Sequence, residues 1–499
     1  MREFELYEAA KLKDGQRQIF NVGKTEMLVL RHHHKLIAIQ SKCPHAGGPL
    51  EEGAICNGRI VCPWHMGTFN LPDGKLIEPP AMQSLDTYSI REGREGVFVS
   101  VPDAKKPVSM HATDKRKFLI VGCGAAGAMA AKTLRDEHFS GKILMVDPHS
   151  EEPIDRTMLT KMSLSGKEPV PKLKELNDLN LTRITASLVR LQSDRKMVTL
   201  SDGSRFKYDA ALIATGGKPK QLPTKVTDKI HVIRHTEDLK SLRRAALPKS
   251  HAVIIGTSFI GMEAASALTQ RGLKVTVIGE EELPFEKQFG CEISSALLSL
   301  HKRKGVKFVL GVKIIQLTNN RVLLQKGDKV VPIDADLVVL GVGVVPKLDF
   351  EHDLPLAADG SVLTDKSLRA DGHVWVAGDI ANVGGRRIEH WRVAQQHGMA
   401  AAKQMLGQRA DVESVPFFWT YHFEKKINYL GHATEWEDIS IVGDVDRLDF
   451  IAFMTTRGKV KAVVSCAKET ETALLAELMR KPLSLSTANR AIRSIASRG

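Results

Sequence analysis

Cysteine and aromatic residues are scarce in this chain of 499 residues, which has six cysteines and 5% aromatic side chains. So few unevenly spaced cysteines do not build a disulfide framework for a chain of this length. No run of 18 apolar residues occurs, which excludes an ordinary transmembrane helix. The first residues are charged and lack the apolar segment of a secretory signal. We therefore expect a cytoplasmic protein.

Acidic side chains are outnumbered, since 71 Lys and Arg stand against 58 Asp and Glu. Residues 1–103 carry 12 basic and 13 acidic side chains, so the whole excess lies after them. A basic chain can bind nucleic acid or a membrane surface. A reductase that attracts anionic nucleotides and acidic partner proteins explains the same charge. We favour the reductase, because the basic residues are dispersed and aromatic residues rarely accompany them.

The patterning changes along the chain. Hydrophobic residues make up 43% of it, and its length suggests about three domains or slightly more. Residues 4–101 show short alternating apolar runs separated by turns, which indicates a small all-β domain. A polar, Pro-containing linker is expected at 104–116. Buried-strand, glycine-turn and helix patterns then occur twice, about 130 residues apart, and indicate two nucleotide-binding domains.

Two short clusters in the β-rich region combine cysteine with histidine. The sequence Cys-Pro-His at 43–45 is followed after sixteen residues by Cys-Pro-Trp-His at 62–65. Two thiolates and two imidazoles suit a [2Fe–2S] cluster in which the cysteines bind one iron and the histidines the other. A Cys₂His₂ zinc site is the alternative, although zinc fingers usually place both cysteines before both histidines. The predicted metal ligands are Cys43, His45, Cys62 and His65.

These two clusters closely resemble those of the Rieske family, and the resemblance covers residues 4–101. Family members with a high potential carry one extra cysteine in each ligand loop, and the two cysteines are joined. Gly48 and Trp64 stand at those positions here, so the resemblance implies the lower-potential ferredoxin type. The family commonly has glycine after the second histidine. This chain has Met66 instead, which we expect to alter the packing near the cluster.

A Gly-x-Gly-x-x-Gly motif at 122–127 follows an apolar strand pattern and begins a helix pattern. Such glycines allow a tight turn and a close approach to a pyrophosphate at the helix N-terminus. Asp147 ends the next strand pattern, where a carboxylate binds ribose hydroxyls. The motif predicts dinucleotide contacts at Gly122, Gly124, Gly127 and Asp147.

A second motif lies at 256–261, with Ser258 in place of the middle glycine. It predicts a second dinucleotide site with contacts at Gly256, Ser258 and Gly261; a helix-packing turn without a ligand is the alternative. Gly279 occupies the place of the expected acid, and Glu280 and Glu281 follow it. Acidic side chains repel a 2′-phosphate, so NADH is favoured over NADPH, with Glu280 as the predicted contact.

Three further segments resemble FAD-dependent pyridine-nucleotide reductases, and the likeness extends over residues 115–405. Segments 214–217 and 341–346 resemble the crossings between the FAD and NAD domains, and 377–379 resembles the turn whose aspartate binds the ribityl chain. The resemblance implies that the NAD domain is inserted within the FAD domain. It also implies cofactor contacts at Gly343 and Asp379.

Within that family the chain resembles ferredoxin reductases and apoptosis-inducing-factor-like proteins, particularly those with an N-terminal Rieske domain. The segments that carry this resemblance are 155–161 and 389–394. It implies that Lys161 lies beside the flavin N5 and pairs with Glu263 near the nicotinamide, and that Trp391 lies against the flavin. These three are the predicted catalytic residues. Further FAD contacts are implied at Arg156 and Arg234.

The resemblance also bears on the reaction type. Disulfide reductases of this fold carry a Cys-x₄-Cys pair beside the flavin, whereas residues 151–165 contain no cysteine. Thiol–disulfide chemistry is therefore disfavoured. Residues after 408 mix strand and helix patterns, and the basic tail after Arg480 is expected to be solvated or frayed.

The sequence therefore predicts a multidomain chain with an all-β Rieske domain, two α/β Rossmann-type domains of the glutathione-reductase type, and an α+β domain. The expected division is a Rieske domain at 1–103, an FAD domain at 117–221 and 335–408, an NAD(P) domain at 222–334, and a C-terminal domain at 409–499.

Our functional hypothesis is an oxidoreductase that passes electrons from NADH through FAD to the [2Fe–2S] cluster and on to an external protein or small molecule. One alternative is the reductase component of a Rieske oxygenase system. Another, of a different class, is an NADH-sensing protein, similar to apoptosis-inducing factors, that docks onto nucleic acid.

Overall fold

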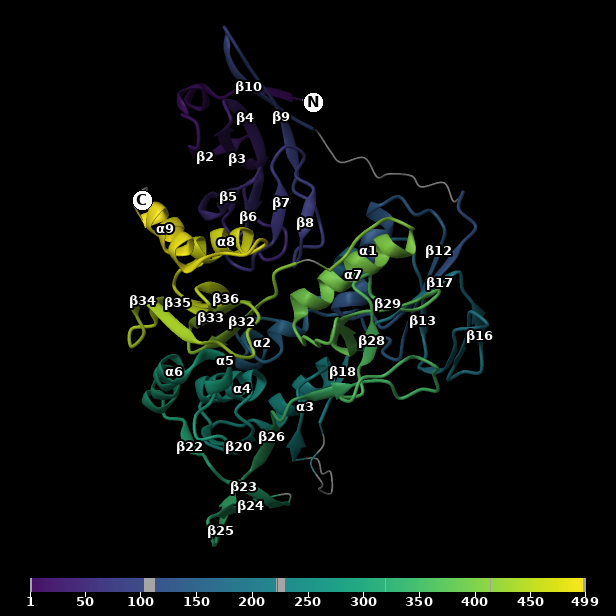
Figure 1. The fold of residues 1–499 in the computed structure, drawn as a ribbon, viewed down its shortest axis with the longest axis vertical. Helices are drawn as coiled ribbons and strands as arrows, with labels where there is room; N and C mark the ends of the chain where they lie inside the picture. The colour runs from purple at the N-terminus through teal and green to yellow at the C-terminus, as the bar shows by residue number, and fades with distance from the viewer. Residues whose placement is uncertain are drawn as a thin grey trace.

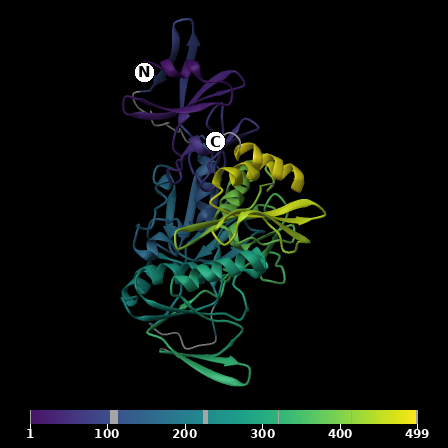
Figure 2. The same cartoon turned by 90° about the vertical axis from the view of Figure 1, so that its left-hand side faces the viewer.

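The computed structural model describes residues 2–102, 113–220, 222, 229–318, 320–412 and 414–496. Most of the expected linker at 104–116 lies outside these ranges. The chain forms four units: the N-terminal unit stands at one end of the molecule, and the unit containing residues 251–340 lies at the other (Figures 1 and 2). None of the helices in the described ranges is long and apolar enough to cross a membrane.

The N-terminal unit consists of two antiparallel sheets, as the alternating apolar pattern predicts. The larger sheet has the order β1-β10-β9-β4-β3-β2 and the smaller β5-β6-β7-β8. Their apolar side chains form the core, in which Leu28, Ile39 and Phe69 are fully buried. The strands are β1 (Arg2–Glu5), β2 (Arg17–Val22), β3 (Thr25–His32), β4 (Lys35–Gln40), β5 (Ala54–Cys56), β6 (Arg59–Val61), β7 (Thr68–Asn70), β8 (Leu76–Glu78), β9 (Thr87–Gly93) and β10 (Gly96–Val101).

The second unit is built on a six-stranded sheet with the order β13-β12-β11-β17-β30-β29. All neighbouring strands in it are parallel except β29 and β30. The Ala-rich helices α1 and α7 pack closely against each other beside this sheet (Figure 1). Its main elements are β11 (Lys117–Val121), α1 (Ala125–Asp136), β12 (Lys142–Asp147), β13 (Thr182–Thr185), β17 (Ala210–Ile213), β29 (Arg369–Asp371), β30 (Val374–Val376) and α7 (Trp391–Met405).

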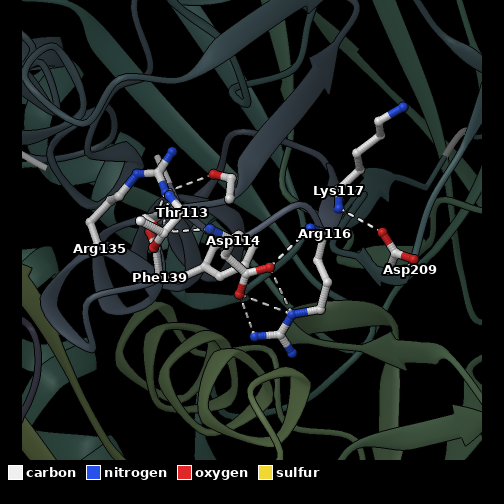
Figure 3. Close-up of polar contacts among 9 residues, drawn as sticks. Thr113, Asp114, Arg116, Lys117, Arg135, Phe139 and Asp209 are labelled. Carbon is white, nitrogen blue, oxygen red and sulfur yellow. Dashed lines mark hydrogen bonds and ion pairs between the residues drawn. The ribbon is translucent and has the colours of Figure 1, made fainter. Parts of the chain in front are cut away.

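Polar contacts fix the point where the chain enters this sheet (Figure 3). The backbone N–H of Lys117, at the start of β11, donates to the Asp209 carboxylate over 2.7 Å, and Arg116 pairs with Asp114 over 2.7 Å. The buried Arg135 guanidinium donates to backbone carbonyls of its own unit, including that of Phe139. These bonds satisfy the polar groups that the edge of the core would otherwise bury.

In the sequence, the third unit lies between the two segments of the second unit, and it repeats the arrangement of a parallel sheet with helices. A parallel sheet with the order β19-β26-β20-β21-β22 carries helices α3, α4 and α6. An antiparallel sheet, β23-β24-β25, extends from it (Figure 2). The elements are β19 (Ile230–His231), α3 (Thr236–Ala245), β20 (His251–Ile255), α4 (Phe259–Gln270), β21 (Lys274–Ile278), α5 (Glu286–Phe289), α6 (Cys291–Arg303), β22 (Lys307–Val309), β23 (Lys313–Leu317), β24 (Arg321–Lys326), β25 (Lys329–Asp334) and β26 (Leu337–Leu340).

The C-terminal unit is an antiparallel sheet with the order β32-β33-β36-β35-β34, and it carries helices α8 and α9. The expectation of a frayed tail is wrong. Residues 485–496 form a helix, and Leu483, Ala488 and Ile492 are buried against the sheet and α8. The elements are β32 (Phe417–His422), β33 (Lys425–Gly431), β34 (Asp438–Asp444), β35 (Asp449–Thr456), β36 (Lys459–Cys466), α8 (Glu469–Leu478) and α9 (Leu485–Ala496).

Candidate functional site

The two Cys/His segments form matching loops in the N-terminal unit. The first follows β4, and the second joins β6 to β7. In each loop the cysteine N–H donates to the carbonyl five residues later, Cys43 to Gly48 and Cys62 to Gly67, both over 2.8 Å. The same backbone pattern thus presents the predicted ligands of both loops on one side of the unit.

The four predicted ligands meet as two pairs of like atoms. The Cys43 and Cys62 thiols contact each other, and His45 Nδ1 lies 3.2 Å from His65 Nδ1. Within the described residues, no three His, Cys, Asp or Glu side chains converge to hold a single metal ion. One tetrahedral zinc ion would need all four donors together. A sulfur pair and a nitrogen pair instead fit the two irons of a [2Fe–2S] cluster.

Backbone amides point at both sulfurs. The Cys43 thiol and the amides of Trp64 and His65 lower the pKa of the Cys62 thiol to about 7. The amides of His45 and Ala46 act on Cys43 in the same direction, although the contact with Cys62 and burial raise the pKa of that thiol. N–H donors around thiolate sulfur are among the features that set the potential of an iron–sulfur centre.

Two departures from the Rieske pattern have a packing explanation. A Cβ at Gly48 would lie 2.8 Å from Cys62 Sγ and 3.2 Å from Trp64 Cγ, so no side chain fits there. The backbone of Met66 has a φ of +60°, a conformation that favours glycine. Its side chain is fully buried with Phe417 and Leu430 of the C-terminal sheet. The methionine therefore joins the ligand loop to another unit.

Both histidines face residues outside the N-terminal unit. His45 Nε2 lies 3.5 Å from a carboxylate oxygen of Asp155, and the His65 ring lies 4.3 Å, between centroids, from the ring of Trp419. Trp419 lines a large cavity in the neighbouring units. Neither Asp155 nor Trp419 was predicted as a functional residue. The position of Asp155 within the motif segment 155–161 was its only sequence signal.

This large cavity and a second one meet at Arg156, which lines both. Burial, and then the neighbouring Arg234, lower the pKa of the Arg156 guanidinium to about 10, so it remains a cation near neutrality. The N-terminus of α1, at Gly124, also opens onto the first cavity. A cation and a helix N-terminus between two cavities suit the pyrophosphate of a dinucleotide.

The other predicted FAD residues lie around these cavities. Asp147 and Gly122 line the second cavity, while Asp379 and Arg234 line the first, where they form an ion pair over 3.0 Å. Gly122 has φ +106, and a Cβ there would lie 2.3 Å from the Ala214 carbonyl oxygen, so only glycine fits. At Gly127 the added atom would lie 1.9 Å from the Gly122 carbonyl oxygen, because the helix packs directly on the turn.

The three predicted catalytic residues line the first cavity together. Lys161 Nζ lies 3.0 Å from Glu263 Oε1. Glu263 also accepts hydrogen bonds from the hydroxyls of Thr160 and Thr420. Trp391 begins α7. The predicted Lys–Glu pair therefore forms, and residues from several units hold it in place.

A buried hydrogen-bonded chain extends from this pair. Thr420 Oγ1 lies 3.0 Å from His422 Nε2, and His422 Nδ1 lies 3.2 Å from His301 Nε2. Because the Glu263 carboxylate only accepts, Thr420 must donate to it over 2.7 Å. His422 Nε2 then donates to Thr420, and His301 Nε2 donates to His422. The direction of the chain fixes both imidazoles as Nε2–H tautomers.

This buried series of hydrogen bonds predicts that the stability of the protein is sensitive to acid. Burial, and then Lys161, lower the pKa of His422 to about 3, below the value of about 6.5 expected in the unfolded chain. Between these values only the unfolded state binds the proton, so the free energy of unfolding falls by about 1.4 kcal/mol per pH unit as the pH drops. When the pH is lowered from about 7 to about 5, we expect the thermal midpoint of His422→Gln to fall less than that of the wild type. Equal losses in scanning calorimetry would contradict this prediction.

A third cavity lies at the second glycine motif and is lined by Gly256, Ser258, Glu280, Glu281 and Gly343. Ser258 is the N-cap of α4, and its hydroxyl accepts from the Gly261 N–H over 3.3 Å, which explains a serine in place of glycine. Phe259 lines both this cavity and the one containing Lys161. The two sites therefore meet at one aromatic ring.

The absence of an acid at Gly279 also has a steric cause. A Cβ there would lie 2.6 Å from Thr257 Cγ2. The carboxylate of Glu281 reaches the same region and accepts from the Thr257 hydroxyl over 2.8 Å. Two acidic side chains therefore line the cavity from the following loop.

Comparisons with known proteins agree with this geometry. The pyridine nucleotide-disulphide oxidoreductase family matches residues 116–398, and the Rieske [2Fe–2S] domain matches residues 2–89. Apoptosis-inducing factor 3 of Mus musculus is 31% identical over 94% of this chain and 82% of its own length. The 3-phenylpropionate/cinnamic acid dioxygenase ferredoxin–NAD(+) reductase component of Photorhabdus laumondii subsp. laumondii is 28% identical over 73% of this chain and 96% of its own.

A solved structure shares the fold. The covalent putidaredoxin reductase–putidaredoxin complex aligns with a TM-score of 0.70 at 23% identity, covering 77% of this chain and 99% of that one. The resemblance to Rieske proteins and to pyridine-nucleotide reductases is confirmed, as are FAD, NADH and a [2Fe–2S] cluster as the cofactors. The chain belongs to the pyridine nucleotide-disulphide oxidoreductase family and is an FAD-dependent oxidoreductase of the ferredoxin-reductase and apoptosis-inducing-factor-3 type with an N-terminal Rieske domain.

Proposed function

We propose that the chain oxidises NADH and passes the electrons, through its own FAD and [2Fe–2S] cluster, to an external acceptor. The observation that carries this proposal is the position of Trp419. Its ring lines the first cavity, which we assign to FAD and call the flavin cavity, and lies 4.3 Å from the ring of His65. When bound, FAD accepts a hydride and releases electrons singly, while the cluster takes up one electron at a time. The two redox sites thus meet within one chain.

The residues around the flavin cavity would hold and orient the reactants. Arg156 and the N-terminus of α1 would bind the pyrophosphate, and Asp147 and Asp379 would accept from ribose and ribityl hydroxyls. The Lys161–Glu263 pair would fix a positive charge beside the flavin, and Trp391 would cover the ring. Phe259, at the boundary of the two cavities, would separate the nicotinamide from solvent.

The residues around the third cavity would select NADH. Glu280 and Glu281 line it, and their negative charges would repel the 2′-phosphate of NADPH. The Thr257 hydroxyl holds Glu281 in place. The acid that usually ends the second strand is thereby replaced by one on the next loop.

We expect Glu281→Ala to lower the ratio of kcat/KM for NADH to that for NADPH by roughly tenfold, since a hydrogen bond to a charged group contributes about 1.5–3 kcal/mol. Steady-state kinetics with both nucleotides measures this ratio. Glu282→Ala is the matched control, because Glu282 lies beside Gly311 rather than in the cavity. A ratio in Glu281→Ala equal to that of the control would contradict the assignment.

The acceptor is proposed to be a one-electron carrier of the ferredoxin type. A relative that matches 73% of this chain is named as the ferredoxin–NAD(+) reductase component of a dioxygenase. This name supports the alternative that the chain is the reductase component of an oxygenase system, in which the acceptor would be a partner of that system. Added ferredoxin or oxygenase should then stimulate NADH oxidation. Nucleic-acid docking is the disfavoured alternative. A gel shift at physiological salt, where phosphate-driven binding weakens steeply, checks it.

We further propose the division into functional domains given by the sequence, with residues 1–103 for the cluster, 117–221 and 335–408 for FAD, 222–334 for NADH, and 409–499 as the C-terminal domain. The order of strands in the separate sheets supports it except at one boundary: β26 (Leu337–Leu340) pairs with β19 and β20 of the third unit, so the NADH domain extends to residue 340. The cavity that contains Lys161 is lined from three of these four domains, the second, third and C-terminal.

Anaerobic titration of the holoprotein with NADH tests the proposed function. Full reduction should require about 1.5 equivalents of NADH per chain, because the flavin takes two electrons and the cluster one. Visible and EPR spectra report the two centres separately. A titration that ends at one equivalent, with the cluster still oxidised, would contradict the proposal.

A further inference from the structure

The N-terminal domain is joined to the rest of the molecule by a buried polar seam. Its strand β8 ends at Glu78, and residues 79 and 80 follow. Helix α7 of the FAD domain contacts this part of the chain, and helix α8 of the C-terminal domain packs against β5 and Glu52 of the N-terminal domain (Figure 1). Buried charged side chains are rare unless they are paired, and the seam contains several of them.

Arg392 makes the central contacts of the seam. Only 4% of it is exposed, and it follows Trp391 at the start of α7. Its guanidinium donates to three backbone carbonyls: Pro79 over 2.7 Å, Val415 over 2.9 Å and Met66 over 3.2 Å. Met66 directly follows the ligand His65. One side chain therefore ties the cluster loop to the helix that begins with the flavin-cavity residue Trp391.

Glu78 balances this buried charge. Its carboxylate lies 3.6 Å from Arg392 and 2.8 Å from Arg480, and it accepts from the Gln396 amide over 2.6 Å. The partners come from α7 and from Arg480, which follows α8, so three domains share one carboxylate. Removing one member of such a buried network leaves an uncompensated charge, which is costly. The network therefore favours one arrangement of the domains.

We propose that Arg392 is a positioning residue that keeps the N-terminal domain docked, with the His65 loop held against the flavin cavity throughout turnover. This inference rests on the proposed function and adds that transfer between the two centres needs no swinging of the Rieske domain. The contacts with the Met66 and Pro79 carbonyls hold the N-terminal domain against α7, and the Glu78 carboxylate adds a second point of attachment. Arg392 acts on the cluster through the loop, and because it also lines the flavin cavity, the rate constants of flavin and cluster reduction must be compared as a ratio.

The test compares Arg392→Met and Arg392→Lys with the wild type as full-length, cofactor-loaded proteins. Stopped-flow spectra after anaerobic NADH addition give two rate constants, one for flavin reduction and one for cluster reduction. We expect the ratio of the second to the first to fall on the order of 10- to 100-fold in Arg392→Met, since small misplacements carry penalties of this size. Arg392→Lys, which keeps the charge, should retain a larger part of this ratio. Small-angle scattering should show a larger maximum dimension for Arg392→Met.

Arg135→Lys is the matched control. Arg135 is also a buried arginine that donates to backbone carbonyls, but all of them belong to the FAD domain (Figure 3). If Arg392→Met does not fold, Glu78→Gln provides the same test, because it removes the charge but keeps the size. A ratio equal to that of Arg135→Lys would overturn the proposal. An unreduced cluster in the wild type would instead refute the proposed function.

Discussion

Cys62→Ser is expected to lose the [2Fe–2S] cluster almost completely while keeping FAD and its reduction by NADH. The Cys62 thiol is buried, contacts Cys43 and receives the amides of Trp64 and His65. Serine has no thiolate with which to bind iron. Among the residues that the structure describes, none of the N-terminal domain lines the flavin cavity, so flavin binding should persist. Iron analysis, EPR and the flavin absorbance of the purified protein measure both outcomes.

Cys466→Ser is the control for this variant. Cys466 is as deeply buried as Cys62 but lies at the end of β36, outside the site. It should therefore keep both iron and flavin. Retention of the full EPR signal by Cys62→Ser would contradict the ligand assignment. Loss of FAD from Cys62→Ser, with the control intact, would contradict the independence of the two sites.

Trp419→Leu is expected to slow electron transfer from flavin to cluster by at least about tenfold, equivalent to about 1.4 kcal/mol of activation free energy. The Trp419 ring is in contact with His65 and lines the flavin cavity, and leucine leaves part of that space without an aromatic ring. Phenylalanine should restore part of the rate. Stopped-flow mixing with NADH measures flavin and cluster reduction in the same trace.

Trp375→Phe is the matched control, because Trp375 is a buried aromatic residue in β30, away from the cluster loops. It should transfer electrons at the wild-type rate. If Trp419→Leu reduces its cluster as fast as this control, the contact with His65 has no part in the transfer.

Local motifs made much of the molecule predictable. The turns at Gly122 and Gly256 are specified by residues within a few positions, and steric contacts in both turns exclude any other side chain. The four predicted ligands were recognisable because a cysteine is closely followed by a histidine in each of two short segments. Helix α9 was missed although Leu485, Ala488, Ile492 and Ile495 have helical spacing. Its basic residues are typical of a solvated tail and obscure this pattern.

The contacts between domains were not predictable. Trp419 and His65 are more than 350 positions apart, and nothing near either residue specifies the contact between their rings. Arg392 had no signal beyond its place beside Trp391, and Glu78 had none. Met66 did stand out as a departure from the family pattern. Its role depends on contacts with residues of the C-terminal sheet, which lie far from it in the sequence.

Anaerobic stopped-flow mixing of the wild-type holoprotein with NADH tests most directly whether the two centres exchange electrons within one chain. The account predicts loss of flavin absorbance first, followed by cluster reduction at a rate that does not depend on protein concentration. A cluster that stays oxidised beside fully reduced flavin, or one whose reduction rate rises with protein concentration, would contradict it.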